Sequence, residues 1–193
     1  IFHDITERKN TENKLSFFAH KEVLTGLSNR RYFIEQLGHH LSKAAKKSKP
    51  LSLLFIDINQ FKTINDIYGH NIGDRTLQII AKRLLNTVSN DDLVCCYGGD
   101  EFAVLLINSN EKNAESVALR IQKSLQNAYQ INEISLDLSV SIGIAQYPDS
   151  GKDANSLLRN ATQAMTNVRH EHLSGIGFHS DQLQIKYLKK LTL

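Results

Sequence analysis

Cysteine is almost absent from this sequence of 193 residues, which contains only Cys95 and Cys96, neighbours in the chain. Neighbouring side chains of a strand point to opposite faces, so a disulfide between these two would be strained. The sequence has no CxxC pair and no set of spaced cysteines. These absences exclude a disulfide-stapled secreted scaffold and a cysteine zinc site, and they favour a reducing, cytoplasmic location.

Long apolar runs are absent as well. No stretch approaches the roughly 18–20 apolar residues of a membrane-spanning helix, and no signal peptide is visible. The net charge of +3 is too small to indicate nucleic acid, which is bound by clustered Lys and Arg with aromatic residues among them. The one basic cluster, Lys43–Lys49, closes a helical pattern, and we interpret it as a solvated helix end rather than a phosphate-binding patch.

What is present is the composition of a globular domain, 41% hydrophobic and 22% charged. The length fits one domain of roughly 150 residues with an appendage. Because the chain begins without Met and ends inside a helical pattern, we expect it to be a piece of a larger protein.

Apolar periodicity divides the chain into helices and strands. Asp4 and Thr6 are cap candidates for an N-terminal helical run, and four further helices are predicted at Tyr32–Lys47, Gly73–Val88, Ala114–Ala128 and Asn155–His170. Strands are predicted at Leu51–Asn59, Leu93–Tyr97, Phe102–Ile107 and Leu136–Tyr147. This order, with one central hairpin, predicts an α+β fold of the ferredoxin-like kind, in which helices cover one or both faces of a mostly antiparallel sheet.

The predicted hairpin carries two adjacent acids, Asp100 and Glu101, directly after Gly98 and Gly99. Glycine suits the turn, but two neighbouring carboxylates repel unless a positive charge lies beside them. Asp57, at the end of the first predicted strand, can approach the same point. Three carboxylates suit Mg²⁺ or Mn²⁺, although the hairpin acids could also serve only to solubilise its tip.

A second polar segment follows Asp57 in a predicted loop that leads into a helix. It contains Lys62, Asn65, Asp66, His70 and Asp74. Asn and Asp side chains can hydrogen-bond a purine edge, and Lys offers a charge for phosphate. As a set these residues predict a nucleotide pocket; singly, they also fit a turn (Asn65 and Asp66) and a helix cap (Asp74).

The stretches "YGGDEF", "FIDINQFKTINDIYGHNIGD" and "LTGLSNRRYF" strongly resemble the GGDEF domain of diguanylate cyclases, over about Leu24–Val168. The resemblance implies a nucleotidyl-cyclase palm. It also implies a homodimer that binds one GTP per subunit and condenses two GTP into cyclic di-GMP, releasing pyrophosphate.

The site residues of the family can be assigned to the matching positions of this chain. The resemblance implies that Asp57, Asp100, Glu101 and the backbone carbonyl of Ile58 hold Mg²⁺, with Glu101 and Asp100 as the acids of catalysis. It implies that Asn65 and Asp74 read guanine. The other implied substrate contacts are Phe61, Lys62, His70, Gly98, Gly99 and Arg169.

The two ends of the chain carry further resemblances. Residues 1–20 resemble the tail of a PAS sensor domain and the signalling helix after it, so the GGDEF domain is expected over residues 21–179. Residues 180–193 resemble the linker to a cyclic di-GMP phosphodiesterase (EAL) domain, or are an ordinary linker helix.

Some positions depart from the family's pattern. Glu22 and Asn59 stand where the family has Asp, and Cys96 stands where it has Arg. Thr166 and Leu173 replace a Tyr and an Arg of the phosphate clamp. Ser89 replaces the Arg of the inhibitory RxxD motif, of which Asp92 remains, so we expect no product-inhibition site.

Three hypotheses follow. The leading one is an active diguanylate cyclase, and the alternative is a weak, regulatory GTP-binding domain that controls an attached EAL domain. The third, a dimerisation module without nucleotide, leaves the acids without a function.

Overall fold

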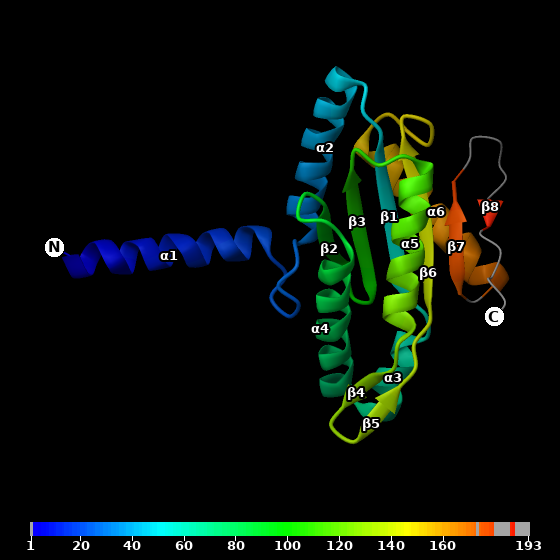
Figure 1. Cartoon of the computed structure of the whole chain (residues 1–193). Coiled ribbons are helices and arrows are strands. Elements are labelled where there is room, and N and C mark those ends of the chain that lie inside the picture. The colour runs from blue at the N-terminus through cyan, green and yellow to red at the C-terminus, as the bar shows by residue number, and fades with distance from the viewer. Residues whose placement is uncertain (1, 173, 180–185, 188–193) are drawn as a thin grey trace.

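A mixed six-stranded sheet lies at the centre of the molecule, with the strand order β2–β3–β1–β6–β7–β8 (Figure 1). The structure, a computed structural model, describes residues 2–172, 174–179 and 186–187. The strands are β1 (Leu51–Ile58), β2 (Leu93–Gly98), β3 (Glu101–Ile107), β6 (Val140–Tyr147), β7 (Gly175–Phe178) and β8 (Lys186–Tyr187). Neighbouring strands pair antiparallel except β6 and β7, which are parallel. A separate hairpin is formed by β4 (Tyr129–Ile131) and β5 (Ile134–Leu136).

Helices pack on both faces of the sheet. They are α2 (Arg30–Lys47), α3 (Phe61–Tyr68), α4 (His70–Thr87), α5 (Glu111–Gln126) and α6 (Ala154–His172), and a further helix, α1 (Phe2–His20), precedes them. All eight residues of β1 are buried, and alternate ones serve two cores. Leu54, Ile56 and Ile58 pack with α3, α4 and α5, whereas Leu53 and Phe55 pack with α2 and α6. A continuous apolar run therefore marks a strand covered on both sides.

Helix α6 lies unusually close to β6, because Gly143 has no side chain. A Cβ atom at Gly143 would lie 2.1 Å from the carbonyl oxygen of Ala161 and 2.2 Å from the backbone nitrogen of Met165. Arg169 is one helical turn beyond Met165. The close packing thus brings the end of α6 to the end of the central strand.

The α+β fold class is confirmed, as are the predicted hairpin strands and the four helices that follow the N-terminal run, apart from shifts of a few residues at their ends. Three details were wrong. Asp4 and Thr6 lie inside α1, which already begins at Phe2, so they do not cap it. The segment after β1 is helix α3 rather than a loop. Leu136–Tyr147 is not one strand, since residues 137–139 separate β5 from β6.

The two ends of the chain complete the description. Helix α1 projects from the body of the domain (Figure 1), where we predicted the signalling helix. The linker helix predicted for residues 180–193 lies outside the described residues, except for Lys186–Tyr187, which form strand β8 instead. None of the helices in the described ranges is long and apolar enough to cross a membrane.

Candidate functional site

Asp57 is a buried carboxylate near the end of the central strand. It is 3% exposed and pairs across the strands with Glu101 on one side and Ser141 on the other. The backbone N–H of Ile58 donates to the carbonyl oxygen of Asp100 at 3.2 Å. This register fixes the hairpin acids beside Asp57, as the sequence predicted from topology alone.

The hairpin tip has the geometry that its glycines permit. Gly98 and Gly99 have φ angles of 158° and 57°, and a side chain at Gly99 would be strained there. Both glycines are exposed, whereas Asp100 and Glu101 are half-buried. The tip therefore offers bare backbone to a ligand while its two carboxylates turn partly inward.

The carboxylates perturb one another. Burial raises the pKa of Asp57, the charge of Asp100 raises it further, and Arg169 opposes both. Burial also raises the pKa of Glu101, as do the charges of Asp57 and Asp100, while Arg169 and Arg30 lower it. Burial, together with repulsion between the acids, thus outweighs the effect of the neighbouring cations on both pKa values.

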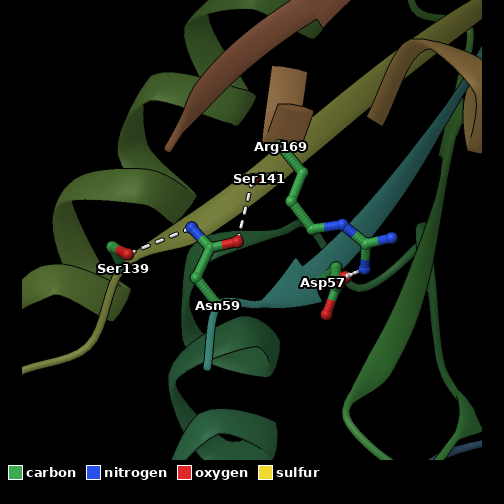
Figure 2. A network of polar contacts seen from close by, with 5 residues as sticks. All are labelled: Asp57, Asn59, Ser139, Ser141 and Arg169. Atoms are coloured by element: carbon green, nitrogen blue, oxygen red, sulfur yellow. Dashed lines mark hydrogen bonds and ion pairs between the residues drawn. The ribbon is translucent and has the colours of Figure 1, made fainter. Parts of the chain in front are cut away.

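Arg169 forms an ion pair with Asp57, and its side chain reaches from α6 to the end of β1 (Figure 2). The Arg169 side chain is 45% exposed, whereas that of Asp57 is 5% exposed. Arg169 is therefore a counter-charge that can turn toward solvent or toward a ligand without leaving a buried cation behind.

The donor set fits a hard divalent cation. Its oxygens come from Asp57, from the hairpin acids and from the Ile58 backbone, all of the type that Mg²⁺ prefers. Among the described residues, no three His, Cys, Asp or Glu side chains form a cluster that could hold a metal ion by themselves. Asp57, Asp100 and Glu101 therefore do not form a complete cage, which Mg²⁺ does not need when it keeps waters and takes substrate phosphate oxygens.

Helices α3 and α4 meet at Asn65. A Cβ atom at Gly73 would lie 1.9 Å from Oδ1 of Asn65 and 3.2 Å from Cζ of Phe61, so a side chain there would displace the Asn65 amide. Asn65 is half-buried, and Asp74, the residue after Gly73, is exposed on α4. The close helix contact thus places Asn65 against the residue that precedes Asp74.

The remaining predicted substrate residues are spread around these helices. Phe61 is buried at the start of α3, and its ring forms part of the α3–α4 contact. Lys62 and His70 are exposed, at the first turn of α3 and the start of α4.

A groove of about 330 Å³ runs beside the hairpin, and sequence reasoning missed most of its lining. Leu24 and Leu77 give it apolar walls, and Gly98 and Gly99 form part of its rim. Arg30 also lines it, with its guanidinium 4.6 Å from the centre of the Tyr97 ring. Leu77 could have been predicted near the site because it lies one helical turn after Asp74. No pattern in the sequence indicated Leu24 or Arg30.

Glu22 and Cys96, two departures from the family's pattern, lie at the same groove. Glu22 accepts hydrogen bonds from the backbone N–H groups of Leu24 and Thr25 and from the Thr25 hydroxyl. Burial raises the pKa of Glu22, but these hydrogen bonds outweigh it and hold the pKa below its usual value. Burial and the nearby charge of Glu22 raise the pKa of Cys96 to about 11, so Cys96 stays a neutral thiol.

Asp92, the remnant of the inhibitory motif, is used within the chain. Its carboxylate accepts hydrogen bonds from the backbone N–H and the hydroxyl of Ser89, at 3.0 and 2.7 Å, and from the backbone N–H of Ile107 at 3.0 Å. Asp92 therefore fastens the α4–β2 turn to the end of β3.

We expect Asp92→Ala to lower the free energy of unfolding by about 1–3 kcal/mol, because it removes a charged acceptor of three hydrogen bonds. Urea unfolding measures this, with the exposed neighbour Asp91→Ala as control. We also expect no binding of cyclic di-GMP that depends on Asp92, since Ser89 supplies no charge for phosphate. Micromolar binding in calorimetry that Asp92→Ala abolishes would contradict this.

The fold and the site define an α+β domain with a cluster of acidic residues at the end of its central strand. The chain belongs to the family "Diguanylate cyclase, GGDEF domain", whose profile matches residues 19–174. The GGDEF domain of TpbB (YfiN) from Pseudomonas aeruginosa superposes with a TM-score of 0.81 at 35% identity, covering 83% of this chain and 95% of that one.

Two curated relatives carry different names. Diguanylate cyclase A of Treponema denticola is 35% identical over 148 residues, 75% of this chain and 40% of the relative. The cyclic di-GMP phosphodiesterase PdeR of Escherichia coli K12 is 33% identical over 162 residues, 84% of this chain and 24% of the relative. The chain spans about a quarter of the length of the first curated relatives that it matches.

Proposed function

We propose that this domain binds GTP with Mg²⁺ or Mn²⁺ and, as a homodimer, condenses two GTP into cyclic di-GMP and pyrophosphate. The observation that carries the proposal is the register at the end of β1, where buried Asp57 lies opposite Glu101 and beside Asp100. In each transfer the 3′-hydroxyl of one GTP attacks the α-phosphorus of the other. A P–O bond forms, pyrophosphate leaves, and the hydroxyl proton is released.

The chain's residues have distinct tasks in this proposal. Asp57, Asp100 and the Ile58 carbonyl would hold the ion, whose positive charge would offset that of the transferring phosphate and the leaving group. Glu101 lies closest to the reacting hydroxyl and holds its proton or a second ion. Arg169 exchanges its ion pair with Asp57 for the triphosphate, and Lys62 adds a second cation for phosphate.

The guanine base is placed between the apolar walls of the groove, with its polar edge toward Asn65 and Asp74. A planar ring suits two leucine side chains, and Leu77 is one helical turn from Asp74. The exposed glycines of the hairpin let the ribose and α-phosphate approach backbone.

A second candidate is a regulatory GTP-binding domain without useful turnover. Two observations favour it: the buried thiol of Cys96 cannot serve as a cation, and Asp57 is already paired with Arg169. In this reading GTP binding controls an attached output domain, and the relatedness to PdeR fits that arrangement.

Product formation separates the two candidates. The chain is incubated with GTP and Mg²⁺, alone and as a dimer enforced by a coiled coil fused before α1, and cyclic di-GMP is measured by chromatography. Product from the enforced dimer supports the cyclase. GTP binding without product supports the regulatory domain, and absence of GTP binding contradicts both.

Discrimination between bases tests the guanine pocket. We expect Asp74→Ala to narrow the ratio of GTP to ATP affinity by about tenfold or more, because a site that hydrogen-bonds a base edge rejects the wrong base through its own unpaired groups. Calorimetry with both nucleotides measures the ratio, and Asp149→Ala, at an exposed position after β6, is the control. An unchanged ratio removes Asp74 from the pocket.

The resemblances at the two ends of the chain lead us to propose which domains flank this one in the larger protein. Helix α1 would be the signalling helix after a PAS domain, and its exposed apolar residues Ile5, Leu15 and Phe18 would pack against a second copy. An EAL domain would follow the last strand, in a cytoplasmic protein.

A further inference from the structure

Asn59, the first residue after β1, has a side chain held from two sides. Its Nδ2 donates to the Ser139 hydroxyl oxygen and its Oδ1 accepts from the Ser141 hydroxyl, both at 3.0 Å (Figure 2). Its backbone N–H also donates to the Ser139 carbonyl oxygen at 2.9 Å. Ser141 is fully buried and lies opposite Asp57 in the β1–β6 pairing. Three hydrogen bonds therefore join the end of β1 to the start of β6, next to the acidic site.

The backbone that these hydrogen bonds hold makes a sharp turn. Gln60 has a φ angle of 57°, a left-handed conformation that is strained by about 1–2 kcal/mol in a residue with a side chain. Helix α3 begins directly afterwards at Phe61, and the Gln60 side chain does not cap it. The turn needs support from outside, and the Asn59 side chain supplies it.

The amide of Asn59 suits its two partners. It donates to one serine and accepts from the other at the same time. A carboxylate of the same length could accept from both serine hydroxyls, because a hydroxyl can rotate to donate. An alanine could do neither, and of these three hydrogen bonds it would keep only the one from its backbone N–H to Ser139.

We propose that Asn59 is a positioning residue that holds the Ile58–Lys62 turn in the geometry needed to bind a divalent cation and a nucleotide phosphate. The inference rests on the proposed function, because GTP with Mg²⁺ is the ligand for which the turn is held. Asn59 does not touch that ligand. It acts through the Ile58 carbonyl and through Lys62, because the backbone of the turn sets the positions of both.

The test is calorimetry with Mg²⁺ and α,β-methylene-GTP, an analogue that cannot release pyrophosphate. We expect Asn59→Ala to weaken binding tenfold or more and Asn59→Asp to bind within threefold of the parent. Gln130→Ala is the matched control, since the exposed Gln130 donates to the Ser135 hydroxyl oxygen at 2.8 Å within the β4–β5 hairpin and has no hydrogen bond to the turn. It removes a similar amide–serine bond and is expected to leave binding unchanged.

Thermal unfolding by circular dichroism accompanies each titration, because a merely structural role would lower the melting temperature and leave the affinity of the folded protein intact. If Asn59→Ala does not fold, Ser139→Ala is tested in its place. We expect Ser139→Ala to weaken binding threefold or more. Affinity of Asn59→Ala within twofold of the parent overturns the inference, as does an Asn59→Asp variant as weak as Asn59→Ala. A parent that binds no nucleotide overturns the proposed function, and this inference with it.

Discussion

Glu101→Gln is expected to retain GTP binding within a few-fold of the parent and to lose formation of cyclic di-GMP. The substitution keeps the shape and the hydrogen-bonding reach of the side chain and removes its charge. In the β1–β3 register Glu101 lies opposite Asp57, so in the proposed reaction it would face the ion and the reacting hydroxyl. Binding by calorimetry and product by chromatography, both on the enforced dimer, measure the two effects.

The same variant has an expected effect on stability. Burial and the charges of Asp57 and Asp100 raise the pKa of Glu101, so the folded chain binds this proton more tightly than the unfolded chain does. Ionisation of Glu101 therefore destabilises the ligand-free fold at neutral pH. We expect Glu101→Gln to raise the melting temperature at pH 7, and this gain to vanish as the pH falls below the usual Glu pKa.

Glu133→Gln is the control for both measurements, because Glu133 is exposed in the β4–β5 turn. Product formed by Glu101→Gln at the parent's rate would show that Glu101 has no catalytic role. A melting temperature lower than the parent's at neutral pH would show that the Glu101 charge is stabilised in the fold.

Asp57→Asn is expected to weaken the binding of GTP with Mg²⁺ on the order of a hundredfold, while binding of GTP in EDTA changes little. An amide oxygen carries no full charge for the cation, and Asp57 is the one deeply buried carboxylate of the site. Arg169 loses its partner in this variant, but its half-exposed side chain is solvated. Loss of fold is therefore not expected.

Paired titrations with Mg²⁺ and with EDTA separate metal binding from nucleotide binding. The control is Asp149→Asn, an exposed carboxylate after β6. Equal affinities of Asp57→Asn and the parent in Mg²⁺ would remove Asp57 from the metal site.

Much of the architecture could be predicted from local patterns. The unbroken apolar run of Leu51–Ile58 indicated a doubly covered strand, and the glycines between two apolar runs indicated the hairpin. Helix α3 was missed because its eight residues include Asn65 and Asp66, which favour turns in isolation. Its packing against Gly73 of α4 overrides that preference.

The candidate site divides in the same way. The sequence by itself determined which residues are available to it: acids after two glycines, Asp57 at a strand end, and Asn65 and Asp74, which we predict to bind a base edge. Only the tertiary structure decided that Glu101 lies opposite Asp57, that Arg169 pairs with Asp57 from 112 residues away, and that Asp92 is bound within the chain. Local sequence reports the periodicity of burial, whereas these contacts depend on strand register and helix packing, which are set by residues far apart in the chain.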